Sequence, residues 1–251
     1  MSVGQIFTAI KRILGPRVMS IQRRHSDNHS HTVIWQEAQE HERGFWIRYI
    51  RRELSITSRD EMVGFRLCEG RVHLCQFGLE WHDFMYSKDP PFVAGKLLDV
   101  GSSVVSVFEK CRSVSVVAID PLLDELARHL PEIVVIGKIN NCEYRCCRIQ
   151  DVMETNFDVV WCNNVLDHTD DWQDIIRHTA RVLKKSGLLF LGVDVRSEVA
   201  LLDAAHISSF TADEVVKEVL ASGFEVVWQS PYLDLPKYRF RLRAIKHKAG
   251  G

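Results

Sequence analysis

Long hydrophobic runs are missing from this 251-residue sequence: nowhere do 18 apolar residues follow one another. A transmembrane helix of ordinary length is therefore not expected. A surplus of positive charge is missing as well, because 32 Lys and Arg stand against 33 Asp and Glu. The chain as a whole thus lacks the charge that holds a nucleic acid, and we expect no nucleic-acid partner. With 46% hydrophobic residues, the composition predicts a packed globular protein.

Cysteine pairs with zinc-finger spacing are also lacking. Cys68 and Cys75 are too far apart for a zinc knuckle, and the neighbours Cys146 and Cys147 would point to opposite faces of a strand. The seven cysteines are odd in number and lie mostly in apolar runs, which is typical of reduced core thiols. We expect a reducing, cytoplasmic compartment and no metal site.

Positive charge is concentrated at the start of the chain. Residues 1–24 contain five Lys and Arg and no acid, and apolar residues at helical spacing run from Val3 to Leu14, before Gly15-Pro16. Such a basic amphipathic helix can lie on an anionic membrane surface, which would make the protein peripheral at the inner membrane. Packing against its own domain or a partner is the alternative. The oligomeric state is left open.

Three regions are expected along the chain. Residues 1–24 form the basic extension, residues 25–95 a helical cap, and residues 96–248 the main domain. Within the cap, residues 33–53 have an apolar side at helical spacing, whereas residues 54–95 show no clear period and remain open.

From Lys96 onward, apolar strand-like runs alternate with helical patterns. This alternation predicts an α/β fold with a doubly wound, mostly parallel, seven-stranded sheet. Asp171 is expected to cap one helix that closes at Ser186-Gly187, and Thr211 with Glu214 forms a capping box on the next. The seven expected strands are KLLDV (96–100), VSVVAID (114–120), YRCCRI (144–149), FDVVWCN (157–163), LLFLGVD (188–194), FEVVWQS (224–230) and YRFRLRAI (238–245).

Ligand-binding residues are expected at the carboxyl ends of these strands. The first strand runs into a small-residue turn that begins at Gly101, where backbone can approach a ligand. Asp120 ends the second strand, 21 residues after Asp99, where a carboxylate can accept hydrogen bonds from both ribose hydroxyls. Asp151, after the third strand, can meet an adenine amino group. Ordinary strand-end or helix-cap roles are the alternatives for Asp120 and Asp151.

Taken together, these motifs resemble the class I S-adenosylmethionine-dependent methyltransferases, whose Rossmann-like fold the strand pattern matches. The matching segments are LLDVGSS (97–103), VVAIDP (116–121), IQD (149–151), VLDH (165–168) and RVLKKSGLLFLGV (181–193). The resemblance implies S-adenosylmethionine as cofactor, with ten residues around it. They are Asp99, Gly101, Ser102, Ser103, Asp120, Pro121, Asp151, Asn163, Asn164 and His168.

Within that superfamily, two further features are similar to bacterial enzymes associated with surface-polysaccharide modification. One is the pairing of IDPLLDEL (119–126) with NNVLDHTDDW (163–172), and the other is a Glu-x-x-Phe-Trp helix before the core, here Glu42 to Trp46. This resemblance implies a carbohydrate or another small hydroxyl compound as methyl acceptor.

One departure from the family concerns the first motif. The family usually continues Gly-x-Gly, but Gly101 is followed by Ser102 and Ser103. A Cβ at the second glycine position can narrow the approach to the cofactor or demand a shifted backbone. A catalytically inactive binding or regulatory subunit is therefore an alternative function.

Transfer to a hydroxyl benefits from a general base that titrates near neutral pH, and histidine is suited to this. His206 lies between the fifth strand and the capped helix, in a loop that commonly faces substrate, so we prefer it over His168. Asp194 can orient such a histidine. A structural role is the alternative for each of them.

The last strand suggests that the acceptor is anionic. Lys237, Arg239, Arg241 and Arg243 alternate with apolar residues and so share one face. The alternative is a solvated face whose long side chains cover apolar surface.

Two other activities fit the sequence less well. A nicotinamide-dependent dehydrogenase needs G-x-G-x-x-G, of which only Gly101 is present. Methylation of nucleic-acid bases is disfavoured because Asn163-Asn164-Val165-Leu166 stands where those enzymes carry Asn-Pro-Pro-Tyr.

Overall fold

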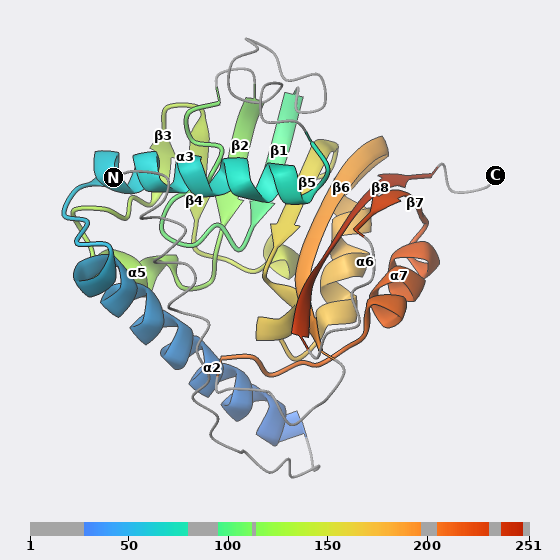
Figure 1. Cartoon of the computed structure of the whole chain (residues 1–251), viewed down its shortest axis with the longest axis horizontal. Helices are drawn as coiled ribbons and strands as arrows, with labels where there is room; N and C mark the ends of the chain where they lie inside the picture. Colours follow the sequence, from blue (N-terminus) through green and yellow to red (C-terminus); the bar gives the residue numbers. More distant parts are fainter. Residues whose placement is uncertain (1–27, 80–94, 112–113, 197–204, 231–236, 248–251) are drawn as a thin grey trace.

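A mixed β-sheet forms the centre of the computed structural model, which describes residues 28–79, 95–111, 114–196, 205–230 and 237–247 (Figure 1). In these residues the sheet has eight strands, in the order β3-β4-β2-β1-β5-β6-β8-β7. The strands are β1 Gly95–Val100, β2 Val114–Ile119, β3 Gly137–Ile139, β4 Cys142–Arg145, β5 Phe157–Asn163, β6 Leu183–Arg196, β7 Phe224–Gln229 and β8 Lys237–Lys246. The basic segment 1–24 lies outside the described residues.

The predicted fold class is confirmed, with one more strand than expected. β4, β2, β1, β5 and β6 pair in parallel, whereas β8 runs antiparallel between β6 and β7. The additional strand, β3, pairs antiparallel with β4. It is three residues long and joins β4 through Asn140, whose φ is 55°. So short a strand leaves no periodic pattern to detect.

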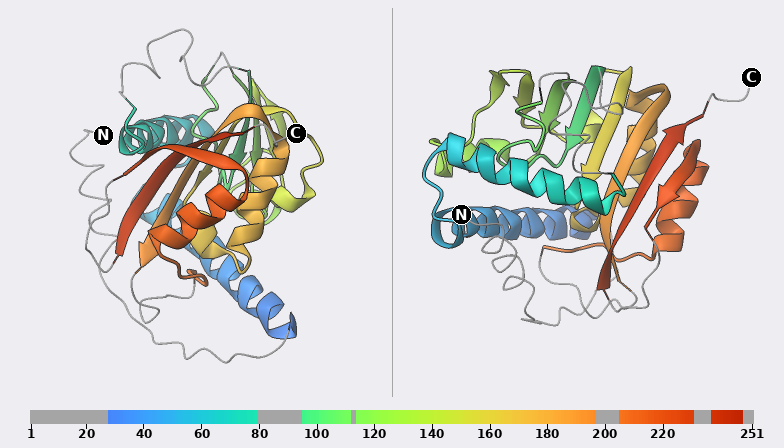
Figure 2. Two further views of the ribbon diagram at one scale, coloured as in Figure 1. Left: turned by 90° about the vertical axis from the view of Figure 1, so that its right-hand side faces the viewer. Right: turned by 45° about the horizontal axis from the view of Figure 1, so that its top comes forward.

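Helices cover both faces of the sheet, as Figure 2 shows. Alternate residues of one strand enter different cores: Leu97 packs with Met62 and Phe77 of the α3 side, and Leu98 packs with Ile176 and Val215 of the α6 and α7 side. The helices are α2 Asn28–Arg48 with a π-helical turn Tyr49–Glu53, α3 Arg59–Gln76, α5 Leu123–His129, α6 Trp172–Val182 and α7 Ala212–Ala221, with 3-10 turns at Ile149–Asp151 and Leu166–His168.

The expected helix at 33–53 is confirmed as α2 and its π-helical turn. The α3 helix was not predicted, although Ser58 and Glu61 form a capping box at its start. Its apolar residues are interrupted by Arg66, which is itself buried, so the stripe is hard to see in the sequence. None of the described helices is long and apolar enough to cross a membrane.

Some of the predicted element ends were wrong. α6 begins after Asp171, whose side chain caps it as expected, but it ends at Val182 instead of Ser186. β6 starts immediately, with Ser186 at φ 61° inside it. The third expected strand is also shifted, because β4 ends at Arg145 and not at Ile149.

All seven cysteines are free thiols, but only Cys142 and Cys162 are buried and Cys75 is exposed, so fewer of them lie in the core than the sequence predicted. Burial raises the pKa of Cys111 and Cys142 to about 12, so these two thiols stay protonated and act as small apolar side chains.

The capping box predicted for α7 is present and should stabilise the start of that helix. The Thr211 hydroxyl accepts from Glu214 N, and the Glu214 carboxylate accepts from Thr211 N at 2.7 Å. Replacing Thr211 with Ala should lower the free energy of unfolding by about 1 kcal/mol, measured by urea denaturation. The exposed Thr155→Ala is the control; equal effects of the two variants would contradict the prediction.

Candidate functional site

The turn after β1 brings backbone N–H groups and small residues to the carboxyl edge of the sheet. Gly101 N and Ser102 N both donate to the Ile119 carbonyl, at 2.9 and 3.1 Å. Gly101 has a φ of 72°, and a Cβ there would collide with the Val165 side chain. Glycine is therefore required at this position, both for the left-handed backbone and for the close approach of Val165.

Asp120 lies beside this turn, where the sequence predicted it. Its Oδ2 accepts from Ser103 N and its Oδ1 from Leu122 N, each at 2.9 Å. The residue is 9% exposed, and its pKa is raised to about 6, mainly by burial and to a smaller extent by the charge of Glu42. The carboxylate thus joins β2 to the turn after β1.

Asp99, another of the predicted cofactor-binding residues, is buried and hydrogen-bonded to a serine of the protein. Only 3% of it is exposed, and its Oδ2 accepts from the Ser106 hydroxyl at 2.6 Å. Burial raises its pKa to about 6, against the effects of Ser106 and Arg66. Asp99 therefore fixes the segment that follows the turn, through Ser106.

Arg66 of α3 is a second support for the turn, and neither this residue nor its helix was predicted from the sequence. Its guanidinium donates to the Val105 carbonyl at 2.8 Å and to the Ser102 carbonyl at 3.2 Å, and pairs with Glu69. Residues 54–95 show no clear period in the sequence, so no signal there links this arginine to the turn.

The serine that replaces glycine adopts the backbone of a glycine. Ser103 has a φ of 56°, a region that costs an L-residue about 1–2 kcal/mol. Its hydroxyl is buried and has no hydrogen-bond partner among the described residues. The position thus keeps the geometry of the missing glycine and carries an unsatisfied hydroxyl.

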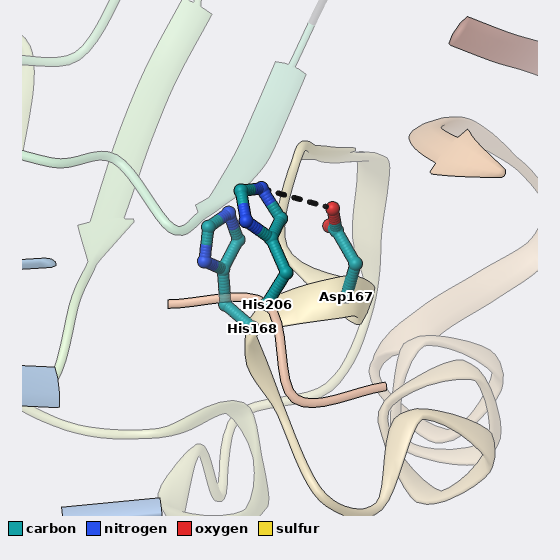
Figure 3. A group of neighbouring side chains, drawn as sticks. All are labelled: Asp167, His168 and His206. Atoms are coloured by element: carbon teal, nitrogen blue, oxygen red, sulfur yellow. Dashed lines mark ion pairs between the residues drawn. The ribbon is translucent and has the colours of Figure 1, made fainter. Parts of the chain in front are cut away.

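Asp167, His168 and His206 come together beside this turn (Figure 3). His206 Nε2 lies 3.5 Å from Asp167 Oδ2, and the two imidazole rings lie 4.5 Å apart. Asp167 is fully buried, and neither of its carboxylate oxygens accepts a hydrogen bond from any described residue. From the sequence, Asp194 was the acid expected to orient the histidine. The structure places Asp167 beside His206 and pairs Asp194 with Arg239 at 3.4 Å.

The contacts of His168 define its tautomer. Its Nδ1 lies 3.0 Å from the Ala205 carbonyl, so Nδ1–H donates there, and Nε2 accepts from the Asn164 amide at 3.2 Å. Glu42 of α2 also lies close, with Oε2 at 3.7 Å from Nδ1. The ligating atoms of Asp167, His168 and His206 lie within 4.8 Å of one another, close enough to be a metal set, which the sequence did not indicate.

The remaining predicted residues lie around this edge. Asn163 ends β5, and its buried Oδ1 has no partner among the described residues. The Pro121 carbonyl faces the Cys146 thiol at 3.3 Å. Asp151 is exposed, and its carboxylate accepts from Arg148 N at 3.1 Å, which corresponds to the helix-cap alternative.

The predicted row of cations on β8 is not an exposed face. Arg241 is 2% exposed and lies against the Phe77 ring and Gly192. Arg243 lies over the Trp228 ring. Arg241 and Arg243 therefore cover apolar surface, which is the alternative that the sequence left open, whereas Arg239 is exposed.

Comparisons with known proteins agree with this geometry. Residues 98–191 match the family described as methyltransferase domain. Ubiquinone biosynthesis O-methyltransferases of two Neisseria meningitidis strains are 33% identical over 58 residues, which cover 22% of this chain and 24% of theirs. The fold is similar to that of Burkholderia thailandensis 1,6-didemethyltoxoflavin-N1-methyltransferase, with 15% identity, a TM-score of 0.52 and coverage of 92% of this chain and 95% of that one.

Residues 98–191 therefore resemble a methyltransferase domain, and the fold similarity extends over most of the chain. The chain spans about a quarter of the length of the curated relatives it matches, and no particular activity follows from these matches alone.

The strained serine gives a prediction with a built-in control. Ser103→Gly should raise the free energy of unfolding by about 1 kcal/mol, because glycine adopts a positive φ without a Cβ penalty. Ser102→Gly, next in the chain but not at a positive φ, should lower it. Urea denaturation of both variants checks this, and destabilisation by Ser103→Gly would contradict the assigned strain.

The buried Asp99 gives a pH prediction. Because its pKa is raised in the folded state, the folded protein binds more protons than the unfolded chain between about pH 4 and 6, so this group lowers stability as the pH rises. The free energy of unfolding of Asp99→Asn, relative to that of wild type, should therefore increase as the pH rises from 4.5 to 7.5, by up to about 3 kcal/mol. Denaturation curves at both pH values measure the gain; a difference that does not change with pH would contradict it.

Proposed function

We propose that this protein is an S-adenosylmethionine-dependent methyltransferase that methylates a hydroxyl group, with a carbohydrate as the first acceptor class to test. The observation that carries the proposal is the contact between Asp120 and the turn at Gly101, within a domain that matches methyltransferases. The N-methyltransferase with a similar fold was solved with S-adenosylhomocysteine bound, which supports the same cofactor here.

The residues at this edge fit a nucleoside cofactor. Each oxygen of Asp120 accepts one backbone hydrogen bond, and a carboxylate oxygen can accept two, so capacity for two ribose hydroxyls remains. The unsatisfied Asn163 Oδ1 and Ser103 Oγ are further polar groups that a ligand can use. Gly101 supplies the left-handed backbone that this turn requires.

Bound S-adenosylmethionine supplies the methyl group: its sulfur–methyl bond breaks with the electron pair left on sulfur, and a carbon–oxygen bond to the acceptor forms. The chain's part is to position the hydroxyl and take its proton. We assign His206 as the base that receives this proton. Asp167, buried 3.5 Å from Nε2, stabilises the imidazolium that results.

This assignment needs no metal ion. Both ring nitrogens of His168 lie within hydrogen-bond distance of protein groups, so a metal would have to displace the Asn164 amide or the Ala205 carbonyl. We therefore expect methyl transfer to persist in excess EDTA. Dependence on added divalent cations would instead assign the three residues as metal ligands.

Two alternative functions can be tested in the same experiment as the proposed methyltransferase. The non-catalytic module is supported by Ser103, whose hydroxyl occupies the position of a family glycine. The second alternative is a nicotinamide-dependent dehydrogenase, although only Gly101 of the G-x-G-x-x-G motif is present in this chain.

Incubation with methyl-labelled S-adenosylmethionine and fractionated cell glycans, with a catechol as a second hydroxyl class, tests the function. A labelled ether product supports the proposal and identifies the acceptor. Binding of the cofactor without transfer to any hydroxyl would favour the module, and binding of NAD alone would favour the dehydrogenase.

Replacing His206 with Gln should lower kcat by about 10²–10⁴-fold because the proton acceptor is lost, while the affinity for S-adenosylhomocysteine stays within about twofold. His247→Gln is the control, since its side chain is 59% exposed beyond β8. Steady-state kinetics and calorimetry separate the two effects; unchanged kcat in His206→Gln would remove His206 as the base.

A further inference from the structure

Helix α2 lies outside the segment that matches the methyltransferase family, yet it crosses the edge of the sheet where β1, β2 and β5 end (Figure 1). It contacts α5, which follows Asp120, and the 3-10 turn that contains Asp167 and His168. Its side chains therefore face the same edge as the candidate site, and Glu42 is the acidic one among them that approaches His168.

The carboxylate of Glu42 is held in place. Its Oε1 accepts from Trp46 Nε1 at 2.9 Å, one turn further along the helix, and its Oε2 lies 3.7 Å from His168 Nδ1. The side chain is 20% exposed, so it faces the protein more than the solvent. This contact also explains the Glu-x-x-Phe-Trp pattern of the sequence, in which the acid and the tryptophan are hydrogen-bonded partners.

Glu42 adds negative charge to an edge that already carries Asp120. Helix α2 contacts α5, which follows Asp120, and the charge of Glu42 contributes to the raised pKa of Asp120. Arg66, the buried cation whose charge acts on Asp120, is already engaged by two backbone carbonyls and by Glu69. Two neighbouring carboxylates repel each other, and a ligand with a positive charge between them relieves that repulsion.

We propose that Glu42 is a specificity-determining residue, which selects the positively charged sulfonium of S-adenosylmethionine over the neutral thioether of the product. This inference rests on the proposed function. The two ligands share the adenosine, the ammonium and the carboxylate groups and differ in the methyl group and its positive charge. An acidic residue on the helix over the site would favour substrate binding and promote product release.

Calorimetric titration of the full chain with S-adenosylmethionine, S-adenosylhomocysteine and sinefungin, a stable analogue with an amine cation near the sulfonium position, tests this. Glu42→Gln should weaken binding of both cationic ligands by about tenfold, and binding of S-adenosylhomocysteine by less than about twofold. Glu40→Gln, an exposed acid on the same helix, is the control and should change none of the three affinities by more than about twofold.

Equal weakening of all three ligands by Glu42→Gln would overturn the proposal, because it would mean that Glu42 binds a group they share. Unchanged affinities would overturn it as well. A wild-type protein that binds none of the three ligands would remove the proposed function itself, which is a separate result. Circular dichroism of Glu42→Gln checks that α2 remains folded.

Discussion

The candidate site depends on one buried carboxylate. Asp120 accepts from Ser103 N and Leu122 N, so a single side chain connects the turn after β1 with the segment after β2. Because burial raises its pKa to about 6, the charge is held against a desolvation cost, which hydrogen-bond donors or a cation can offset. The positions of Gly101 and of the nucleoside that we propose both follow from this contact.

The order of apolar runs was enough to predict the sheet, because parallel strands buried on both faces leave continuous hydrophobic segments such as those at Leu97 and Val159. Asp120 and Gly101 were found for the same reason, since strand ends can be located. The short strand β3 and the helix α3, whose apolar stripe is interrupted by Arg66, leave no comparable pattern in the sequence. Contacts between distant segments, such as Arg66 to Ser102 or Glu42 to His168, have no sequence signal at all without the fold.

The sequence left two features with alternative roles: the serine at position 103 and the cationic residues of β8. Ser103 keeps the left-handed backbone of the glycine it replaces, so the departure changes a side chain and not the path of the turn. The cationic row on β8 is largely used for packing, since Arg241 is buried. The chemistry therefore concentrates at one edge, where acids and histidines gather.

The most direct test of the central claim is the affinity for S-adenosylhomocysteine of wild type and of Asp120→Asn, measured by calorimetry at pH 7.5. The account predicts micromolar binding by wild type and a loss of at least about tenfold in the variant, because the amide offers fewer acceptor sites to ribose hydroxyls. Equal affinities of the two proteins would contradict it.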